Sequence, residues 1–440
     1  MNILLIHPKM NHGPVTVKER GTFRGRFFSP AEMTLPGVAA CIPKNHNVRL
    51  IHETFEDIDY SNKYDIVGIS CFTLFAPQVY EIADKFRSMG ITVVIGGYHA
   101  SAMPQEAKKH ADSVVIGEAE LTFPKLLEDF KKGKLQSFYK AERPVKSEEL
   151  PAIRRDLFKY DPVSAGIRIT RGCLNKCEFC SITHFFNHCY RKRPIKNVIE
   201  EFKSIPYKVI AIQDSTLTVD LEYTKQLFKK MIEEKINKKW VGMGNINILG
   251  RDEEYLKLAK KSGCICWTTG FESVSQESLD SVNKTSNKVE KYAEWIKTIK
   301  KHGMAVNGLF MFGFDQDYPD IFEKTLNALK KLEVDSGEFN ILTPLPGTPL
   351  YKKMDSNGRI FTKDWSKYTH TKTVFRPKNM TVEELDNGLK KVVTEFFSIS
   401  NIIKRNIRLM KTSSNPSTIS TLLSMNMSHR KWYQREFNFK

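Results

Sequence analysis

The residues best suited to chemistry are three cysteines in the run RGCLNKCEFC, namely Cys173, Cys177 and Cys180. Thiolates are soft ligands that suit iron–sulfur clusters, and the CxxxCxxC spacing directly follows a strand-like segment, GIRIT. Three thiolates leave one iron of a four-iron cluster without a protein ligand, and such an open position can bind a substrate or a cofactor. The spacing therefore predicts that the three cysteines are the metal ligands of a catalytic 4Fe–4S cluster.

Two other interpretations of the cysteines carry less weight. Cys189 could complete a structural zinc site, but such sites usually use two-cysteine knuckles, and the chain has no second CxxC of that kind. A disulfide framework is unusual in a chain of 440 residues without a secretory signal at its start. The eight cysteines fit a reducing compartment instead, and we expect a cytoplasmic protein.

The RGCLNKCEFC run resembles the cluster-binding loop of the radical S-adenosylmethionine (radical SAM) superfamily, in which an aromatic residue such as Phe179 is typical before the third cysteine. The resemblance implies that SAM binds the open iron and that the reduced cluster cleaves it to methionine and a 5′-deoxyadenosyl radical. That radical removes hydrogen from an unactivated carbon, which ordinary acid–base side chains cannot do. It also implies an oxygen-sensitive enzyme with a flavodoxin or ferredoxin as electron donor.

Alternating strands and helices between about residues 150 and 350 must position this loop. Six strands are predicted near GIRITRG, KVIAIQDST, WVGMGNIN, CICWTTGFES, AVNGLFMFGF and SGEFNILTPLPGTP, with an amphipathic helix after most of them. Parallel strand–helix units in this number predict an open, partial (β/α)6 barrel. Because barrel enzymes carry their chemistry on the loops after the strands, the cysteine loop has the expected place after the first strand.

Other strand ends of this barrel carry candidate cofactor contacts. Gln213 and Asp214 follow the second strand, Asn245 follows the third, and Glu272 and Ser273 end the fourth. The GFES segment resembles the part of the radical SAM fold beside the ribose and methionine of SAM. A lone acidic residue at a strand end is often only a helix N-cap, and for Asp214 both interpretations stay open.

The first part of the chain, residues 1 to about 145, predicts a doubly wound parallel sheet. Apolar runs in ILLIHP, NVRLIHE, DIVGISCF, TVVIGG and SVVIGE alternate with helical patterns, and such sheets bind ligands beyond the carboxyl ends of their strands. The residues at those ends are Ser70, Thr73, Gly96, Gly97, His99, Gly117 and Glu118. Glycines there let a flat or phosphorylated ligand approach the backbone.

IGGYHASAMPQEA and VVIGEAELTFPKLLEDF resemble the cobalamin-binding domain that precedes many radical SAM domains. On that resemblance, the strand-end residues contact cobalamin. No DxHxxG follows the first strand, so we expect cobalamin without a histidine lower ligand. His99 is either a polar wall of the pocket or a hydrogen-bonded loop histidine. The alternative is a flavodoxin-like domain without a ligand.

Composition adds a basic balance, with 68 Lys and Arg against 50 Asp and Glu and a formal net charge of +18. This favours anionic partners without choosing among them. No apolar run reaches the length of a transmembrane span.

A proline- and charge-rich spacer at about 136–162 predicts an extended segment that crosses between the domains. Residues 351–440 predict a mostly helical region whose basic tail is a solvated helix face rather than a contact with a membrane or nucleic acid.

The two resemblances together imply a cobalamin-dependent radical SAM enzyme, and methyl transfer to an unreactive carbon or phosphorus of a small molecule or peptide is the leading hypothesis. Cobalamin-assisted cyclisation, rearrangement or oxidation without methylation is the first alternative. A non-catalytic zinc- or nucleic-acid-binding protein is the second, because of the charge of +18.

Overall fold

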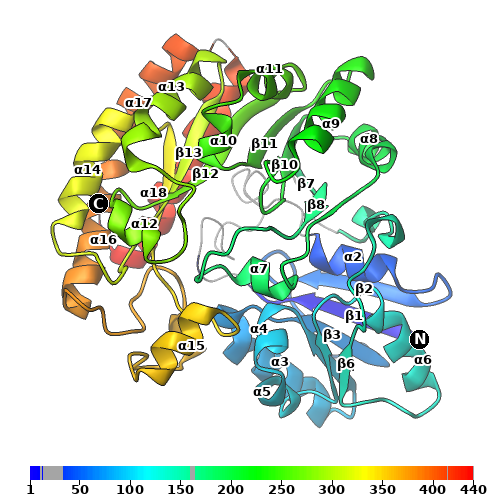
Figure 1. The fold of residues 1–440 in the computed structure, drawn as a ribbon. Coiled ribbons are helices and arrows are strands. Elements are labelled where there is room, and N and C mark those ends of the chain that lie inside the picture. Colours follow the sequence, from blue (N-terminus) through cyan, green and yellow to red (C-terminus); the bar gives the residue numbers. More distant parts are fainter. Residues whose placement is uncertain (10–11, 13–32, 159–163, 414, 440) are drawn as a thin grey trace.

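Two parallel sheets and a helical C-terminal region make up the protein (Figure 1). The computed structural model describes residues 1–9, 12, 33–158, 164–413 and 415–439. In Figure 1 the N-terminal sheet, blue to cyan, lies below the green and yellow barrel, and helix α7, Ser181–Phe185, lies between them. The end of the predicted spacer, residues 159–162, falls outside the described residues.

The N-terminal sheet has six parallel strands in the order β2-β1-β3-β4-β5-β6. This order is that of a doubly wound sheet and confirms the predicted fold. The strands are β1 Asn2–His7, β2 Asn47–His52, β3 Ile66–Ser70, β4 Thr92–Gly96, β5 Ser113–Ile116 and β6 Phe138–Lys140. The short edge strand β6 was not predicted, because three residues carry no period of their own. The helices are α2 Thr34–Ala40, α3 Ala76–Ser88, α4 Tyr98–Ala102, α5 Pro104–Lys108 and α6 Thr122–Lys131.

The second sheet is an open barrel of six parallel strands in the order β14-β13-β12-β11-β10-β7. The strands are β7 Ser164–Ile167, β10 Val209–Ile212, β11 Lys239–Met243, β12 Cys264–Glu272, β13 Ala305–Phe312 and β14 Ser336–Ile341. All six predicted strands are present, so the partial barrel is confirmed. Its helices are α8 Ile195–Ser204, α9 Leu221–Glu233, α10 Ile246–Leu249, α11 Glu253–Lys261, α12 Gln276–Asp280, α13 Tyr292–Lys301 and α14 Ile321–Leu332. Amphipathic spacing turns the apolar side of each long helix onto the sheet.

Large aromatic residues fill the barrel core. Trp240 and Trp267 meet edge to face with ring centroids 5.3 Å apart, and Phe310 stacks on Phe271 and Phe339. These side chains are fully buried and come from four neighbouring strands. Burial of such large rings holds the strand ends in register for the site described below.

The helices of the C-terminal region are α15 Pro349–Ser356, α16 Val382–Phe396, α17 Ile399–Thr412 and α18 Pro416–Phe437. Helices α16 and α18 pack against the edge strand β14, and α17 packs against α18. The mostly helical region predicted for residues 351–440 is confirmed, and α16 and α17 are separated at Ser398, whose side chain caps α17. The tail differs from the solvated face expected for it, because Tyr433 is fully buried and its hydroxyl donates to Phe339 O at 2.9 Å. No helix in the described part of the chain combines the length and apolarity that a bilayer crossing needs.

Short 3-10 helices complete the chain. They are η2 Thr73–Phe75, η3 Ser147–Glu149, η4 Arg155–Leu157, η5 Val289–Lys291 and η6 Trp365–Lys367.

Candidate active site between the two sheets

The cysteine loop begins and ends at a two-stranded antiparallel ribbon. Strand β8, Thr170–Arg171, pairs with β9, Arg191–Lys192, so the ribbon brackets all residues of the loop. Cys173 and Cys177 are buried, and Cys180 is half-buried. Cys180 lies near enough to raise the pKa of the Cys173 and Cys177 thiols. Among the described residues, no three His, Cys, Asp or Glu side chains are placed so that they could hold a metal ion together. Burial raises the pKa of Cys177 to about 11, and the positive charge of Lys284 opposes this shift.

Asp214 anchors the start of the loop. Its carboxylate accepts hydrogen bonds from Ile169 N at 2.8 Å and from both the N–H and the hydroxyl of Thr170 at 2.7 Å. Burial raises the pKa of Asp214 to about 6, although these hydrogen bonds favour the charged form. The structure thus gives Asp214 three hydrogen bonds from Ile169 and Thr170, just before the cysteines, which is the role of a positioning residue.

Glu272 lies at the end of β12, where the ladder to β13 shifts register and the backbone turns left-handed with φ 62°. Its carboxylate pairs with Lys284 Nζ at 2.9 Å, and both side chains are about 90% buried. Burial lowers the pKa of Lys284, but Glu272 and the nearby Cys177 and Cys180 outweigh that effect and raise it above its usual value. A buried positive charge therefore lies beside the thiols, at the strand end predicted to contact SAM.

The other predicted barrel residues lie at the same strand ends. Gln213 N donates to Ile167 O at 2.8 Å and its side chain lies against Gly166 inside the barrel. Asn245 N donates to Thr218 Oγ1, and Ser273 Oγ accepts from Ser275 N. Phe179 is half-buried against the main apolar core. Their roles as cofactor contacts remain predictions.

A cavity of about 200 Å³ lies between the N-terminal sheet and the cysteine loop. Strand ends β3, β4 and β5 supply one side of it, including the predicted residues Ser70, Gly96, Gly97, Gly117 and Glu118. The barrel supplies the other side, with Arg168, Arg171, Ile182, Phe185 and Phe186. One side of the cavity is therefore the sheet edge at which doubly wound sheets bind their ligands, and the other side is the loop that carries the three cysteines.

Gly97 and Gly117 belong to the lining of this cavity. Gly97 has φ 96°, and a Cβ there would approach Cys71 N to 3.0 Å. Gly117 has φ 80°, and a Cβ there would meet no atom within 4 Å. Gly117 thus needs glycine for its backbone conformation, and the space beside it is left to a ligand.

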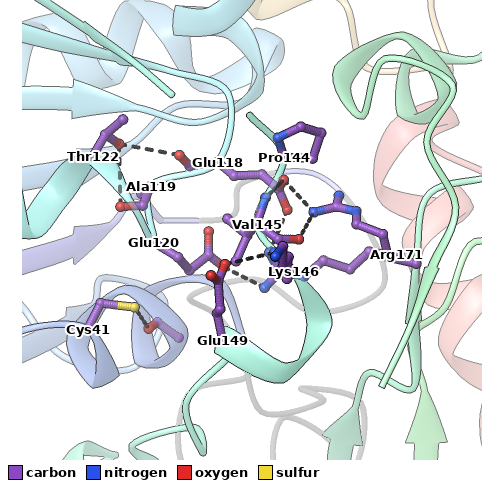
Figure 2. A network of polar contacts seen from close by, with 12 residues as sticks. Cys41, Glu118, Ala119, Glu120, Thr122, Pro144, Val145, Lys146, Glu149 and Arg171 are labelled. Atoms are coloured by element: carbon purple, nitrogen blue, oxygen red, sulfur yellow. Dashed lines mark hydrogen bonds and ion pairs between the residues drawn. The ribbon is translucent and has the colours of Figure 1, made fainter. Parts of the chain in front are cut away.

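An ion-pair network joins the two sheets at the rim of the cavity (Figure 2). Arg171 contacts Glu118 at 2.7 Å and Glu120 at 2.5 Å, and Arg191 contacts the second oxygen of Glu118 at 2.7 Å. All four side chains are 10 to 13% exposed. Burial raises the pKa of Glu120, but Arg171 outweighs it and holds that pKa below its usual value. These pairs fix the residue two positions before Cys173 to the strand end of β5.

Tyr98 forms a second link between the sheets. Its hydroxyl donates to Ser181 O at 2.7 Å, directly after Cys180, and its ring packs on Phe185 with centroids 5.6 Å apart. Burial raises the pKa of Tyr98 to about 12, so the phenol stays protonated and remains a donor.

Thr73 and His99, which were predicted to contact cobalamin, are not among the residues that line the cavity. His99 is fully buried, and its two ring nitrogens lie 3.3 Å from Thr73 Oγ1 and from Glu106 Oε1. Trp365 donates to the same Glu106 oxygen at 2.8 Å and packs edge to face on His99. The structure thus gives His99 the hydrogen-bonded loop position, where it helps to dock the C-terminal region onto the N-terminal domain.

Comparisons with known proteins agree with this geometry. Residues 41–127 match the B12 binding domain and residues 167–329 match the radical SAM superfamily. A bacteriochlorophyllide d C-12(1)-methyltransferase of Chlorobaculum tepidum is 31% identical over 84% of this chain and 83% of that protein. The chain belongs to the cobalamin-dependent radical SAM enzymes. A bacteriochlorophyllide d C-8(2)-methyltransferase from the same organism is 30% identical over 89% of this chain and 90% of that protein.

Solved structures of this family share the fold. The methyltransferase TsrM from Kitasatospora setae, with cobalamin and a [4Fe-4S] cluster bound, has a TM-score of 0.68 and 13% identity, and the match covers 99% of each chain. The cobalamin-dependent radical enzyme OxsB has a TM-score of 0.70 and 13% identity over 98% of this chain and 71% of that one. Residues 348–432 match a domain of unknown function, DUF4070.

Membership of this family brings a 4Fe–4S cluster, SAM and cobalamin, and the residues present fit them. Three thiols on one buried loop are a donor set for a cluster with an open iron. The cavity beside the same loop is largely apolar and has glycines in its lining, which suits a flat corrin ring. Family membership also decides against the non-catalytic interpretation.

Sequence reasoning missed Arg171, Glu120, Tyr98 and Lys284. Arg171, Glu120 and Tyr98 lie within two positions of residues that were predicted, so their position along the chain was a usable signal. Lys284 had no such signal, because only the fold brings it from beyond β12 to the cysteine loop.

Proposed function

We propose that this enzyme transfers a methyl group from SAM, through cobalamin, to an unactivated carbon of a small-molecule substrate. The observation that carries the proposal is a cavity that has strand ends of the cobalamin-type domain on one side and the cysteine loop on the other. When bound, the two cofactors supply the radical and the methyl carrier, and the protein positions them and excludes water.

The chain's own residues have separate tasks in this proposal. Cys173, Cys177 and Cys180 hold the cluster, and Asp214 fixes the strand that enters their loop. Ser70, Gly96, Gly97, Gly117 and Glu118 contact cobalamin, with no histidine on cobalt. Glu272 and Ser273, with Gln213 and Asn245, contact SAM at the barrel strand ends.

The domain limits 1–145, 150–350 and 351–440 and the cytoplasmic setting belong to the same proposal. Eight free cysteines support a reducing compartment. A flavodoxin or ferredoxin is the proposed electron donor. The substrate screen starts with tetrapyrroles, because two relatives that align over most of their length are named for a bacteriochlorophyllide.

The deciding experiment begins with anaerobic reconstitution in the presence of hydroxocobalamin, followed by assay of iron, sulfide and corrinoid per chain. About four irons and about one corrinoid per chain are expected. Incubation with methyl-labelled SAM and substrate should then give a product that carries the label.

A relative named as an anaerobic magnesium-protoporphyrin IX monomethyl ester cyclase, 25% identical to this chain, favours ring formation as the second candidate. Product that forms together with 5′-deoxyadenosine but never carries the labelled methyl group would replace methyl transfer with that chemistry. A cluster without corrinoid would rule out the cobalamin mechanism altogether.

A further inference from the structure

Helix α17 exposes an apolar stripe. Ile399, Ile403, Ile407 and Met410 recur at intervals of four, four and three residues and therefore lie on one side of the helix. Their side chains are 46%, 52%, 53% and 61% exposed, while Ile402 and Leu409 of the same helix are buried against the protein. We call these four exposed residues the α17 stripe.

Exposed large hydrophobic side chains are concentrated on α17 and α18 rather than spread evenly over the described surface. Twelve large hydrophobic side chains are exposed among the described residues, and six of them lie on α17 and α18. The two on α18 are Leu423 and Met427. The long barrel helices α8, α9, α11, α13 and α14 contribute none. Concentration of exposed apolar side chains on one helix is a mark of an interaction surface.

Positive charge flanks the stripe. Lys404 and Lys411 are exposed on α17, next to the apolar side. From Lys404 to the end of the chain there are eight Lys and Arg residues and one Glu. An exposed apolar strip bordered by lysines is the pattern of a helix that lies in the surface layer of an anionic bilayer.

A basic cavity of about 270 Å³ lies beside α17. Lys330, Lys404, Arg405 and Arg408 line it together with Leu329 and other apolar residues of α14 and α16. One carboxylate in the lining belongs to Glu395, which pairs with Lys330 at 3.1 Å, and Glu333 lies 3.5 Å from Arg408. Four cations against these two carboxylates leave the cavity positive.

Arg405 is the unusual member of this cavity. It is 7% exposed, and its hydrogen bonds go to neutral acceptors, Phe396 O at 2.7 Å and Asn426 Oδ1 at 2.9 Å. Within the described residues its Nε has no hydrogen-bond partner. Burial lowers the pKa of Arg405 to about 9, and Asp335, the carboxylate that opposes this, is already paired with Lys300 at 2.9 Å. A bound anion would supply the missing negative charge.

We propose that α17 docks the enzyme on an anionic membrane surface, with the α17 stripe in the interfacial layer and lipid phosphate groups at Lys404, Lys411 and the basic cavity. Figure 1 places α17 on the side of the barrel away from the N-terminal sheet, so docking leaves the candidate active site free. The surface lies within residues 348–432, the segment that matches a domain of unknown function. The inference does not depend on the reaction proposed above.

The test is co-flotation of the full chain with vesicles of phosphatidylcholine, with and without phosphatidylglycerol. Binding is expected only to the anionic vesicles and should weaken with added salt. The double variant Ile403→Glu, Ile407→Glu should bind about tenfold more weakly, because charges replace the inserted side chains. Lys404→Ala with Lys411→Ala should reduce both the binding and its salt dependence.

The control is Met89→Glu, which introduces a single glutamate at a residue 47% exposed on the N-terminal domain and should bind like the wild type. Thermal unfolding of each variant checks that it is folded. The proposal is overturned by absence of binding to anionic vesicles at low salt, or by equal binding of the Ile403→Glu, Ile407→Glu variant. A wild-type dimer in light scattering that this variant converts to a monomer, without vesicle binding, would show that a second copy covers the stripe instead.

Discussion

The guanidinium of Arg171, two residues before the first cysteine of the motif, contacts the carboxylate of Glu118 at the end of β5, 2.7 Å away. One residue of the cysteine loop is thus tied to one residue of the cobalamin-type sheet, and Glu120 holds the same arginine at 2.5 Å. This contact fixes the start of the cysteine loop to the strand end of β5.

Arg171→Met should destabilise the protein by about 3–5 kcal/mol, because it leaves the buried Glu120 without its cation and Glu118 paired with Arg191 alone. Urea unfolding measures this effect. Arg154→Met, which breaks the exposed pair with Asp156 at 2.7 Å, should cost less than about 1 kcal/mol. Similar losses for the two variants would show that the inter-domain network is not a special source of stability.

Replacement of Cys173, Cys177 or Cys180 by alanine should abolish the cluster, because each thiol is a proposed iron ligand. Iron content after reconstitution and formation of 5′-deoxyadenosine from SAM are the two measurements. Cys189→Ala is the control and should keep about four irons per chain. Loss of metal in the Cys189 variant, with zinc in place of iron in the wild type, would restore the zinc interpretation.

Gly117→Val should lower the corrinoid content, because the side chain would enter the cavity beside the strand end of β5. Gly90→Val is a matched control, since Gly90 has a similar φ of 76° and equally open surroundings but lies outside the cavity. Both substitutions should destabilise the folded backbone by the same amount, about 1 kcal/mol. Only the Gly117 variant should also lose corrinoid. Equal corrinoid binding by the two variants would place cobalamin elsewhere.

Lys284→Met should shift the reduction potential of the cluster to a more negative value. Removal of a buried positive charge leaves Glu272 unpaired beside the thiols and disfavours the added electron. A redox titration followed by electron paramagnetic resonance measures the shift. Lys291→Met, at an exposed pair with Glu294, should leave the potential unchanged. A potential that does not move in the Lys284 variant contradicts this prediction.

The pH dependence of stability should carry a signature of Asp214. Its pKa is raised from 3.8 in the unfolded chain to about 6 in the folded protein, so the folded state holds the proton more tightly. The contribution of Asp214 to the free energy of unfolding is complete below pH 3.8 and is lost as the pH rises through about 6. Between these two pH values the free energy of unfolding falls by about 1.4 kcal/mol for each pH unit. Asp214→Asn should remove this slope in denaturant titrations at several pH values, and an unchanged slope would assign it to another group.

The local sequence was enough to determine the strands of both sheets except the short edge strand β6, because buried parallel strands are short apolar runs between amphipathic helices. It also determined the cysteine motif and the glycine-bearing strand ends, since these depend only on spacing along the chain. The break at Ser398 between α16 and α17 escaped the pattern, because a serine is equally acceptable inside a helix and at its cap.

Only the tertiary structure decided which of these residues meet. Glu118 and Arg171 are 53 positions apart, and His99 and Trp365 come from opposite ends of the chain, so no local pattern could pair them. The role of the buried His99 was also decided only by the tertiary structure. Its position after a strand fits both a wall of the ligand pocket and a hydrogen-bonded loop histidine. Spacing fixes the chemistry that a segment can perform, whereas long-range packing fixes which segments share a cavity, because contacts between distant residues depend on the whole fold.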